Sequence, residues 1–393
     1  MRKNWELKKL GEVCEIGAGN SAPQKKELFN GGKYPFFRTS DVGRIRFGVI
    51  DDSVDKLNEI GIKKLHLYKK GTLLFPKSGA STFLNHRVLM ATDGYVSSHL
   101  ATLKAKDNIL DDRFLLYFSS TVDSRSLMQD QNYPSLRLSD IQEIIILLPS
   151  FHEQKRLAKV LDEVFEKTAK AKENAEKNLQ NSRELFESYL QSVFANPGDG
   201  WEEKKLGEIA NIEYGFTNKA KGVGDYRYVR ITDIDKNGNL EKENKVFVNL
   251  SEETKKFLLK DGDLLMARTG ATYAKVLLYQ NFEKSVFASY LIRISFKMNI
   301  INKLYWYFSK SRIYWDQAHK LSSGSAQPQF NGGALKELIF YFPKYLHDQK
   351  SIIAKLDTLS AETKKLEAIY QQKLADLDEL KKSVLQKAFN GDI

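Results

Sequence analysis

The chain contains the same sequence pattern twice, and this duplication constrains its fold more than any other feature. Residues 5–13 have the sequence WELKKLGEV and residues 201–209 have the sequence WEEKKLGEI, so seven of nine positions are identical. Three further pairs of segments recur in the same order: 34–42 with 226–234, 71–81 with 262–272, and 117–119 with 307–309. Between these segments the two copies differ freely, which is typical of one scaffold that presents two different binding surfaces.

The repeated segments predict two similar globular domains. They are rich in β-branched and aromatic residues and are interrupted by Gly and Asn, which is a pattern of strands and turns. A length of 393 residues fits two or three domains of about 150 residues each. We therefore expect an α+β protein with mixed strands and helices in domains 1–150 and 197–345, separated by two long helices at 151–196 and 346–393.

The two expected helices have apolar residues at alternating steps of four and three, which is the spacing of a coiled coil. The predicted seam comprises Leu157, Leu161, Val164, Ala171, Ala175 and Leu185 in the first helix and Ile352, Leu356, Leu359, Leu366, Tyr370, Leu377 and Leu380 in the second. The first seam is small in its middle, so antiparallel pairing would set Ala171 against Tyr370 and Leu185 against Leu356 without voids. This predicts a pseudo-two-fold symmetric, antiparallel coiled coil within one chain. The alternative is that each helix packs separately on its own domain.

Composition restricts the class of protein. The formal net charge is +11 and the pI is about 9.2, and a basic surface attracts phosphate backbones, although many basic proteins bind no nucleic acid. No apolar run approaches the ~18 residues that a membrane span needs, and the first residues lack a signal-peptide pattern, so we expect a cytoplasmic protein without membrane contact. The single cysteine, Cys14, excludes an internal disulfide framework and a cysteine-based zinc site.

Signatures of catalysis do not occur in the sequence. It has no phosphate-binding loop of the form GxxxxGK[ST], no dinucleotide-binding GxGxxG after a strand, and no HExxH metal pair. The tetrapeptides NPPY and DPPY of adenine methyltransferases do not occur either. We therefore predict no catalytic residue, no metal site and no cofactor in this chain, against the alternative of a nuclease or methyltransferase whose motifs are not recognisable.

The organisation resembles the specificity subunit of type I restriction-modification enzymes. The resemblance covers the whole chain and is carried by residues 5–13 and 201–209, by HEQKR at 152–156 and HDQK at 347–350, and by LQKAFNG at 385–391. It implies sequence-specific binding of double-stranded DNA at a bipartite, asymmetric site. It also implies two methyltransferase subunits that use S-adenosylmethionine, and restriction subunits that use ATP and magnesium. Two alternatives are a specificity subunit of a related restriction or phage-defence system with a different nuclease, and a basic coiled-coil scaffold.

Base recognition requires hydrogen-bonding side chains on loops. The candidates in the first domain are Arg38, Lys77, Ser78, His86 and Arg87. The candidates in the second domain are Arg230, Arg268, Thr269, Tyr273, Ser322, Gln327 and Gln329. Each of them could instead contact a phosphate, which would fix the position of the DNA without selecting its sequence.

Overall fold

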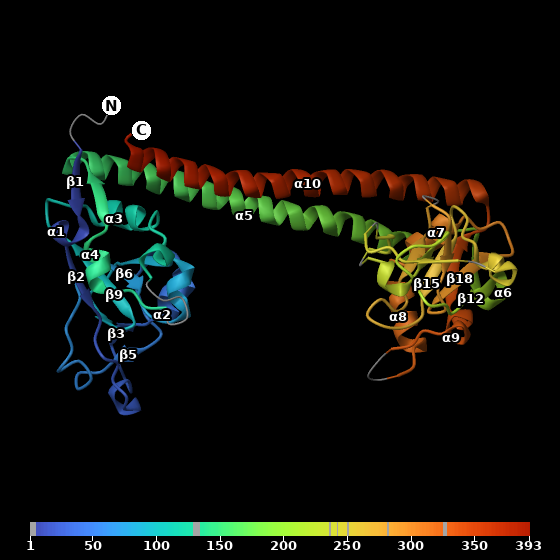
Figure 1. Cartoon of the computed structure of the whole chain (residues 1–393), viewed down its shortest axis with the longest axis horizontal. Helices are drawn as coiled ribbons and strands as arrows, with labels where there is room; N and C mark the ends of the chain where they lie inside the picture. Colours follow the sequence, from blue (N-terminus) through green and yellow to red (C-terminus); the bar gives the residue numbers. More distant parts are fainter. Residues whose placement is uncertain are drawn as a thin grey trace. The chain divides into compact units, whose positions relative to one another are not determined.

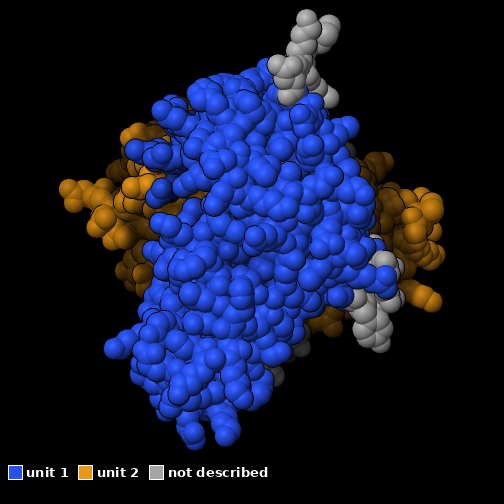
Figure 2. All heavy atoms as spheres, turned by 90° about the vertical axis from the view of Figure 1, so that its left-hand side faces the viewer, with its two compact units in different colours: residues 1–175, 373–393 blue, residues 176–372 orange. Residues whose placement is uncertain are grey.

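The computed structural model describes residues 5–128, 134–235, 237–241, 243–249, 251–280, 283–324 and 328–393. The chain folds as two compact units, which Figure 2 colours separately. Unit 1 comprises Met1–Ala175 and Lys373–Ile393, and unit 2 comprises Glu176–Gln372. The boundaries fall inside the helices α5 (Phe151–Ala195) and α10 (Leu346–Asn390), so each unit contains a part of both helices.

Unit 1 is built around a five-stranded sheet of order β2-β9-β6-β7-β4, in which only β4 and β7 are parallel. Its strands are β2 (Cys14–Ala18), β9 (Leu100–Ala105), β6 (Thr72–Pro76), β7 (Arg87–Met90) and β4 (Phe47–Ile50). A three-stranded sheet contains β5 (Lys56–Leu57), β3 (Tyr34–Phe37) and β8 (Tyr95–Val96). A two-stranded sheet contains β1 (Glu6–Lys9) and β10 (Ile145–Leu148). The short helices are α1 (Leu10–Val13), α2 (Thr39–Ile45), α3 (Asp112–Ser119) and α4 (Leu138–Gln142), with 3-10 turns η1 (Lys26–Leu28), η2 (Ala80–Leu84) and η3 (Ser124–Leu127).

Unit 2 repeats this arrangement with a four-stranded sheet of order β12-β18-β15-β16. Its strands are β12 (Ala210–Tyr214), β18 (Leu291–Phe296), β15 (Leu264–Ala267) and β16 (Val276–Leu278). A three-stranded sheet contains β14 (Phe247–Val248), β13 (Tyr226–Val229) and β17 (Ser285–Phe287). A two-stranded sheet contains β11 (Trp201–Lys205) and β19 (Ile339–Pro343). The helical elements are α6 (Leu206–Ile209), α7 (Asn302–Phe308), α8 (Arg312–Leu321), α9 (Gly332–Glu337), η4 (Ile231–Asp233) and η5 (Glu252–Phe257).

The prediction of two similar α+β domains is confirmed, because strands in equivalent sequence positions pair in the same order. The central strand of each unit explains why. In β6, Leu73 and Leu74 are both fully buried, and they point into two different hydrophobic clusters on opposite faces of the sheet. In β15, Leu264 and Leu265 do the same. A strand covered on both faces needs a continuous apolar run, which the repeated Leu-Leu provides.

Both long helices contribute to the hydrophobic core of each unit. In unit 1, Leu157 and Leu161 of α5 share a cluster with Ala388 of α10, and Figure 1 shows the C-terminal end of α10 beside the first turns of α5. In unit 2, Phe194 of α5 and Leu356 of α10 belong to one cluster. The alternative of two helices that pack separately on their own domains is therefore wrong, since the end of α10 completes the core of the N-terminal domain.

The two helices run antiparallel within each unit, as predicted. In unit 1, Lys172 Nζ lies 2.9 Å from Asp378 Oδ1, and in unit 2, Arg183 Nε lies 3.3 Å from Glu367 Oε2. These two ion pairs agree with a single register. They place Arg183 level with Glu367, so the expected pairing of the nearby Leu185 with Leu356 is displaced by about two and a half helical turns.

In the middle of α5, only one of its two apolar lines is buried, whereas the second line is buried at Leu157 near the start of the helix. Thr168, Ala175 and Ser182, spaced by seven residues, are buried, as is Thr363 of α10. Three predicted seam residues are instead exposed: Leu185 is 53%, Leu366 is 37% and Leu380 is 48% accessible. Small side chains allow the two helices to approach each other closely. One residue in seven then lies at the centre of the contact between α5 and α10, and the second apolar line lies at its side.

A buried glutamine connects the start of each long helix to its domain. In unit 1, Gln154 Oε1 accepts from the backbone N–H of Asp111 at 2.8 Å, and its Nε2 donates to the carbonyls of Ile109 and Pro149 at 3.0 and 2.9 Å. In unit 2, Gln349 has the equivalent partners Ile301, Asn299 and Pro343. Both glutamines are 0% exposed, so these bonds fix the direction in which each helix leaves its domain.

We predict that Gln154→Leu lowers the free energy of unfolding by about 2–4 kcal/mol, because the N–H of Asp111 and the carbonyls of Ile109 and Pro149 lose the buried amide that bonds them. Urea denaturation of the full chain measures this. Gln180→Leu is the matched control, because Gln180 is exposed on the same helix. Among the described residues, its side chain donates a hydrogen bond only to Glu184. Equal effects of the two substitutions would contradict the role of Gln154.

We also predict that Ala175→Leu destabilises the chain by about 1–3 kcal/mol, because the close helix contact has no room for three more carbons. Leu185→Ala should change stability by less than about 0.5–1 kcal/mol, because that side chain is exposed. Thermal unfolding of both variants tests the assignment. A larger loss for Leu185→Ala would show that the second apolar line lies in the seam.

Candidate nucleic-acid interface

The loop after the central strand has the same backbone structure in both units. In unit 1, β6 is followed by Lys77, Ser78 and Gly79; in unit 2, β15 is followed by Arg268, Thr269 and Gly270. The two glycines have φ angles of 77° and 82°, a conformation that residues with a Cβ rarely adopt. The turn therefore depends on glycine and presents the two preceding side chains at the end of the sheet.

Two neighbouring segments hold this loop through equivalent hydrogen bonds. The N–H of Lys77 donates to the carbonyl of His99 at 3.0 Å, and the N–H of Arg268 donates to the carbonyl of Tyr290 at 3.0 Å. Backbone bridges join Ser78 to Ser135 and Thr269 to Gln329. We name these residues edge 1 (Lys77, Ser78, His99, Ser135) and edge 2 (Arg268, Thr269, Tyr290, Gln329).

Edge 1 contains small polar groups. Ser78 Oγ and His99 Nδ1 are 2.7 Å apart, and His99 is exposed. Lys77 is half-buried, and its ammonium has no ion pair among the residues that the structure describes. A hydroxyl, an imidazole and an ammonium can donate to the N7 and O6 acceptors of purine bases or to phosphate oxygens.

Edge 2 contains a guanidinium held by aromatic rings. Arg268 Cζ lies 5.4 Å from the centre of the Tyr214 ring and 5.0 Å from that of Tyr290. Tyr290 is 50% exposed, so the stack lies at the surface. Arg268 Nε is buried and has no hydrogen-bond partner among the described residues. A guanidinium held in a plane can donate two parallel hydrogen bonds, which is the geometry of guanine recognition.

A second polar and aromatic group lies near edge 2 in the sequence and involves α8. Tyr273 Oη is 2.5 Å from His319 Nδ1, and the ring of His319 lies 5.7 Å from that of Trp315. Ser322 donates its hydroxyl to the carbonyl of Ala318, so this candidate closes the end of α8. Gln329 is exposed, whereas the candidate Gln327 lies outside the described residues.

Arg38 and Arg230 occupy equivalent structural positions. The N–H of Arg38 donates to Asp41 at 2.8 Å, and the N–H of Arg230 donates to Asp233 at 2.9 Å. Their side chains form ion pairs, Arg38 with Asp55 and Arg230 with Asp233. These contacts give both arginines a role in holding the domain together, and their prediction as base contacts remains a prediction.

Arg87 is a correction to the sequence-based candidates, because its side chain is 0% exposed. Its guanidinium donates to the carbonyls of Ser119, His86 and Val122 and to Ser124 Oγ, and its Cζ lies 3.4 Å from the centre of the Phe75 ring. The burial of Arg87 could not be predicted from the sequence, because an arginine at the start of a strand is usually a surface residue. Its neighbour His86 is half-buried, and burial together with the charges of Arg46 and Arg87 lowers its pKa.

Sequence reasoning missed His99, Tyr290 and Tyr214. A signal for the first two existed, because His99 precedes Leu100-Ala101 and Tyr290 precedes Leu291-Ile292 at the same place in the repeat. Exposed, hydrogen-bonding or aromatic residues at variable repeat positions are typical of a binding surface.

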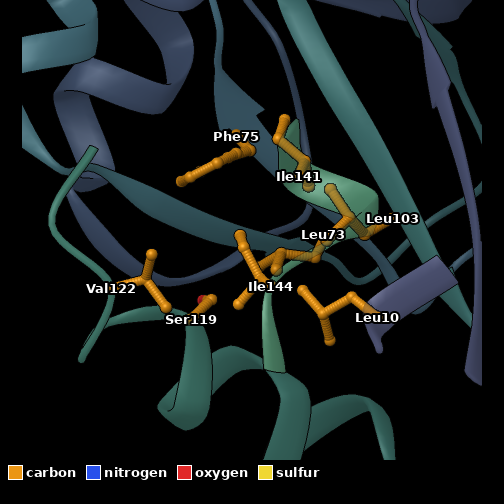
Figure 3. Close-up of a pocket in the computed structure, with 8 residues that line it drawn as sticks. All are labelled: Leu10, Leu73, Phe75, Leu103, Ser119, Val122, Ile141 and Ile144. Atoms are coloured by element: carbon orange, nitrogen blue, oxygen red, sulfur yellow. The ribbon is translucent and has the colours of Figure 1, made fainter. Parts of the chain in front are cut away.

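Neither the small cavity in unit 1 nor the groove in unit 2, both lined by described residues, is an enclosed site for a small molecule. Figure 3 shows a cavity of about 10 Å³ in unit 1, lined by apolar side chains such as Leu10, Phe75 and Ile144. This volume barely holds one water molecule, so it is a packing gap. A groove of about 900 Å³ lies in unit 2.

No helix among the described residues is long and apolar enough to cross a membrane.

Two repeated α+β domains, each with a variable edge on a constant backbone frame, define a duplicated recognition protein. A family model described as the type I restriction modification DNA specificity domain matches residues 2–180 and 198–374. The MjaVIII specificity subunit of Methanocaldococcus jannaschii is 24% identical over 425 aligned positions, covering 100% of this chain and 93% of that protein. The MjaIX specificity subunit of the same organism is 25% identical, and its alignment spans 54% of this chain and only 53% of that protein.

Two solved structures have the same fold. One, described as the structural basis of complex assembly and conformational transition of the type I R-M system, has a TM-score of 0.75 at 16% identity and covers 99% of this chain and 98% of that chain. The HsdS subunit from Thermoanaerobacter tengcongensis has a TM-score of 0.66 at 18% identity, with coverages of 99% and 97%. The chain belongs to the family of DNA specificity subunits of type I restriction-modification systems.

We predict that Arg87→Met lowers the free energy of unfolding by about 3–5 kcal/mol, because three carbonyls and the hydroxyl of Ser124 lose a buried, charged donor. Lys77→Met, on the surface of the same unit, should cost less than about 0.5 kcal/mol. Denaturant unfolding of the two variants compares them. A stable Arg87→Met variant that has lost DNA binding would restore Arg87 as a contact residue.

Proposed function

We propose that each domain recognises one half of a two-part DNA site through its edge. The observation that carries this proposal is the pair of edges, in which the same backbone hydrogen bonds hold different side chains. A constant frame places donors reproducibly, and exchange of the side chains changes which bases they select. Because edge 1 and edge 2 differ chemically, the target has two unlike halves.

The two edges favour different base contacts. The stacked guanidinium of Arg268 suits the O6 and N7 acceptors of guanine. The Ser78 and His99 pair offers one donor and one acceptor whose roles depend on the histidine tautomer. The net charge of +11 adds attraction to phosphates that is independent of sequence and weakens with salt.

We further propose that the chain is a non-catalytic component of a larger complex in the cytoplasm. Its family membership supports two methyltransferase subunits that use S-adenosylmethionine, and restriction subunits that use ATP and magnesium, as partners. In this proposal those cofactors bind to the partners, and this chain supplies the sequence selectivity.

The test replaces one residue on each edge. In the reconstituted complex, Arg268→Met should relax a single base position in one half of the site by about 1–3 kcal/mol, or roughly 5- to 150-fold in selectivity. Lys77→Met is the matched control and should affect only the other half. Sequencing of methylated DNA and competition binding with single-base variants measure both effects.

A uniform loss of affinity on all sequences after Arg268→Met would identify a phosphate contact instead. Binding of the wild-type complex that is equal for all DNA sequences would overturn the proposed function.

A further inference from the structure

Unit 2 contains a groove of about 900 Å³ that no assigned function uses. Its walls come from α5 and α10 on one side, and from α7, α8 and residues 237–239 on the other. Its lining includes basic and aromatic side chains, namely Arg183, Lys275, Lys310, Lys364, Trp306 and Trp315. Phe186, Leu190 and Val276 add an apolar floor.

The equivalent position in unit 1 is filled by the chain itself. Phe47 of the edge strand β4 lies 5.6 Å from Tyr117 and 5.5 Å from Phe165, measured between ring centres, and Lys381 Nζ lies 5.5 Å from the centre of its ring. Phe47 therefore packs between the sheet and both long helices.

The repeat shows why this position is open in unit 2. Tyr117 corresponds to Tyr307, Phe165 to Ser360 and Lys381 to Phe186. Ser360 and Phe186 both line the groove. The sheet of unit 2 ends at β16 and has, among the described residues, no strand in the place of β4. Phe165 is thus replaced by serine, and Asn239, which also lines the groove, occupies the repeat position of Phe47 at the offset of 192 that relates 34–42 to 226–234.

Basic groups outnumber acidic groups in the described lining, which contains Arg183, Lys275, Lys310, Arg312 and Lys364 but only Glu187 and Glu367 as carboxylates. Arg183 pairs with Glu367 and Arg312 with Asp316, but Lys275, Lys310 and Lys364 have no ion pair among the described residues. Lys310 Nζ lies 3.3 Å from the centre of the Trp306 ring. Burial and the charge of Lys364 lower the pKa of Lys310 to about 8, although the charge of Asp235 acts in the opposite direction. A carboxylate beside these ammonium groups would relieve their desolvation and mutual repulsion.

We propose that this groove docks an extended, acidic segment of a partner protein that carries one aromatic side chain. The aromatic ring would take the place that Phe47 has in unit 1, and the carboxylates would pair with Lys275, Lys310 and Lys364. The apolar floor and the position of Phe47 favour a protein segment over a nucleic-acid strand. Docking would occur at the second domain only, which makes the two halves of the duplicated chain unequal toward their partners. The proposal does not depend on base recognition by the edges.

The chain's own β4 segment provides the probe, because residues 47–52 have the sequence FGVIDD, an aromatic residue followed by two carboxylates. We expect a fluorescently labelled, acetylated FGVIDD peptide to bind the full chain saturably in polarisation measurements. Binding should also change the tryptophan fluorescence, since Trp306 and Trp315 line the groove. A peptide with alanine in place of phenylalanine should bind at least about tenfold more weakly.

Two substitutions in the groove should weaken binding in different ways. Ser360→Phe fills the position as Phe165 does in unit 1 and should weaken binding by about tenfold or more. Lys364→Glu reverses an exposed charge and should weaken binding by about fivefold. Lys355→Glu, exposed on the same helix but outside the groove lining, is the control and should have no effect. Circular dichroism of each variant checks folding.

Absence of saturable binding, or equal binding to wild type, Ser360→Phe and Lys364→Glu, would overturn the proposal. Competition of the peptide by duplex DNA, with a parallel loss of DNA affinity in Lys364→Glu, would assign the groove to nucleic acid and overturn it as well. The DNA selectivity of the same variants is measured in parallel. It tests the proposed function of the edges independently of peptide binding in the groove.

Discussion

The structure depends on the burial of the ends of both long helices in the core of each domain. In unit 1, Leu157 of α5 and Ala388 of α10 are far apart in the sequence and share one cluster; in unit 2, Phe194 of α5 and Leu356 of α10 do so. A domain without either helix end would expose a large apolar surface to water. The buried glutamines Gln154 and Gln349 add direction to this nonspecific attraction, because their hydrogen bonds are satisfied in only one orientation of each helix.

Recognition by this protein follows from a separation between backbone and side chains. The carbonyls of His99 and Tyr290 accept equivalent hydrogen bonds, and glycines at equivalent positions make equivalent turns. The side chains at the ends of these segments take no part in these backbone hydrogen bonds, and they differ between the two domains. One fold can therefore carry two selectivities, provided that the residues that fix the loop remain. Arg87 belongs to that framework, since its guanidinium joins the strand β7 to the end of α3 and to the segment that follows α3.

The duplication is imperfect in a way that has a physical consequence. Unit 1 fills the space between sheet and helices with Phe47, whereas unit 2 has Ser360 and a basic groove there. A loss of aromatic volume in a core is costly unless water or a ligand occupies the space. An open, charged groove is compatible with water and with an acidic partner.

The sequence alone determined the duplication, the α+β class, the two long helices and the loops after the central strands, because these follow from repeated segments and from periodicity. Periodicity shows which residues lie on one helix face, but not how close the partner helix comes. Only the tertiary structure decided that Thr168, Ala175 and Ser182 are central while Leu185, Leu366 and Leu380 are exposed. It also decided that Arg87 is buried and that His99 and Tyr290 belong to the edges. Burial and neighbourhood are set by contacts between residues far apart in the chain, and no local pattern contains them.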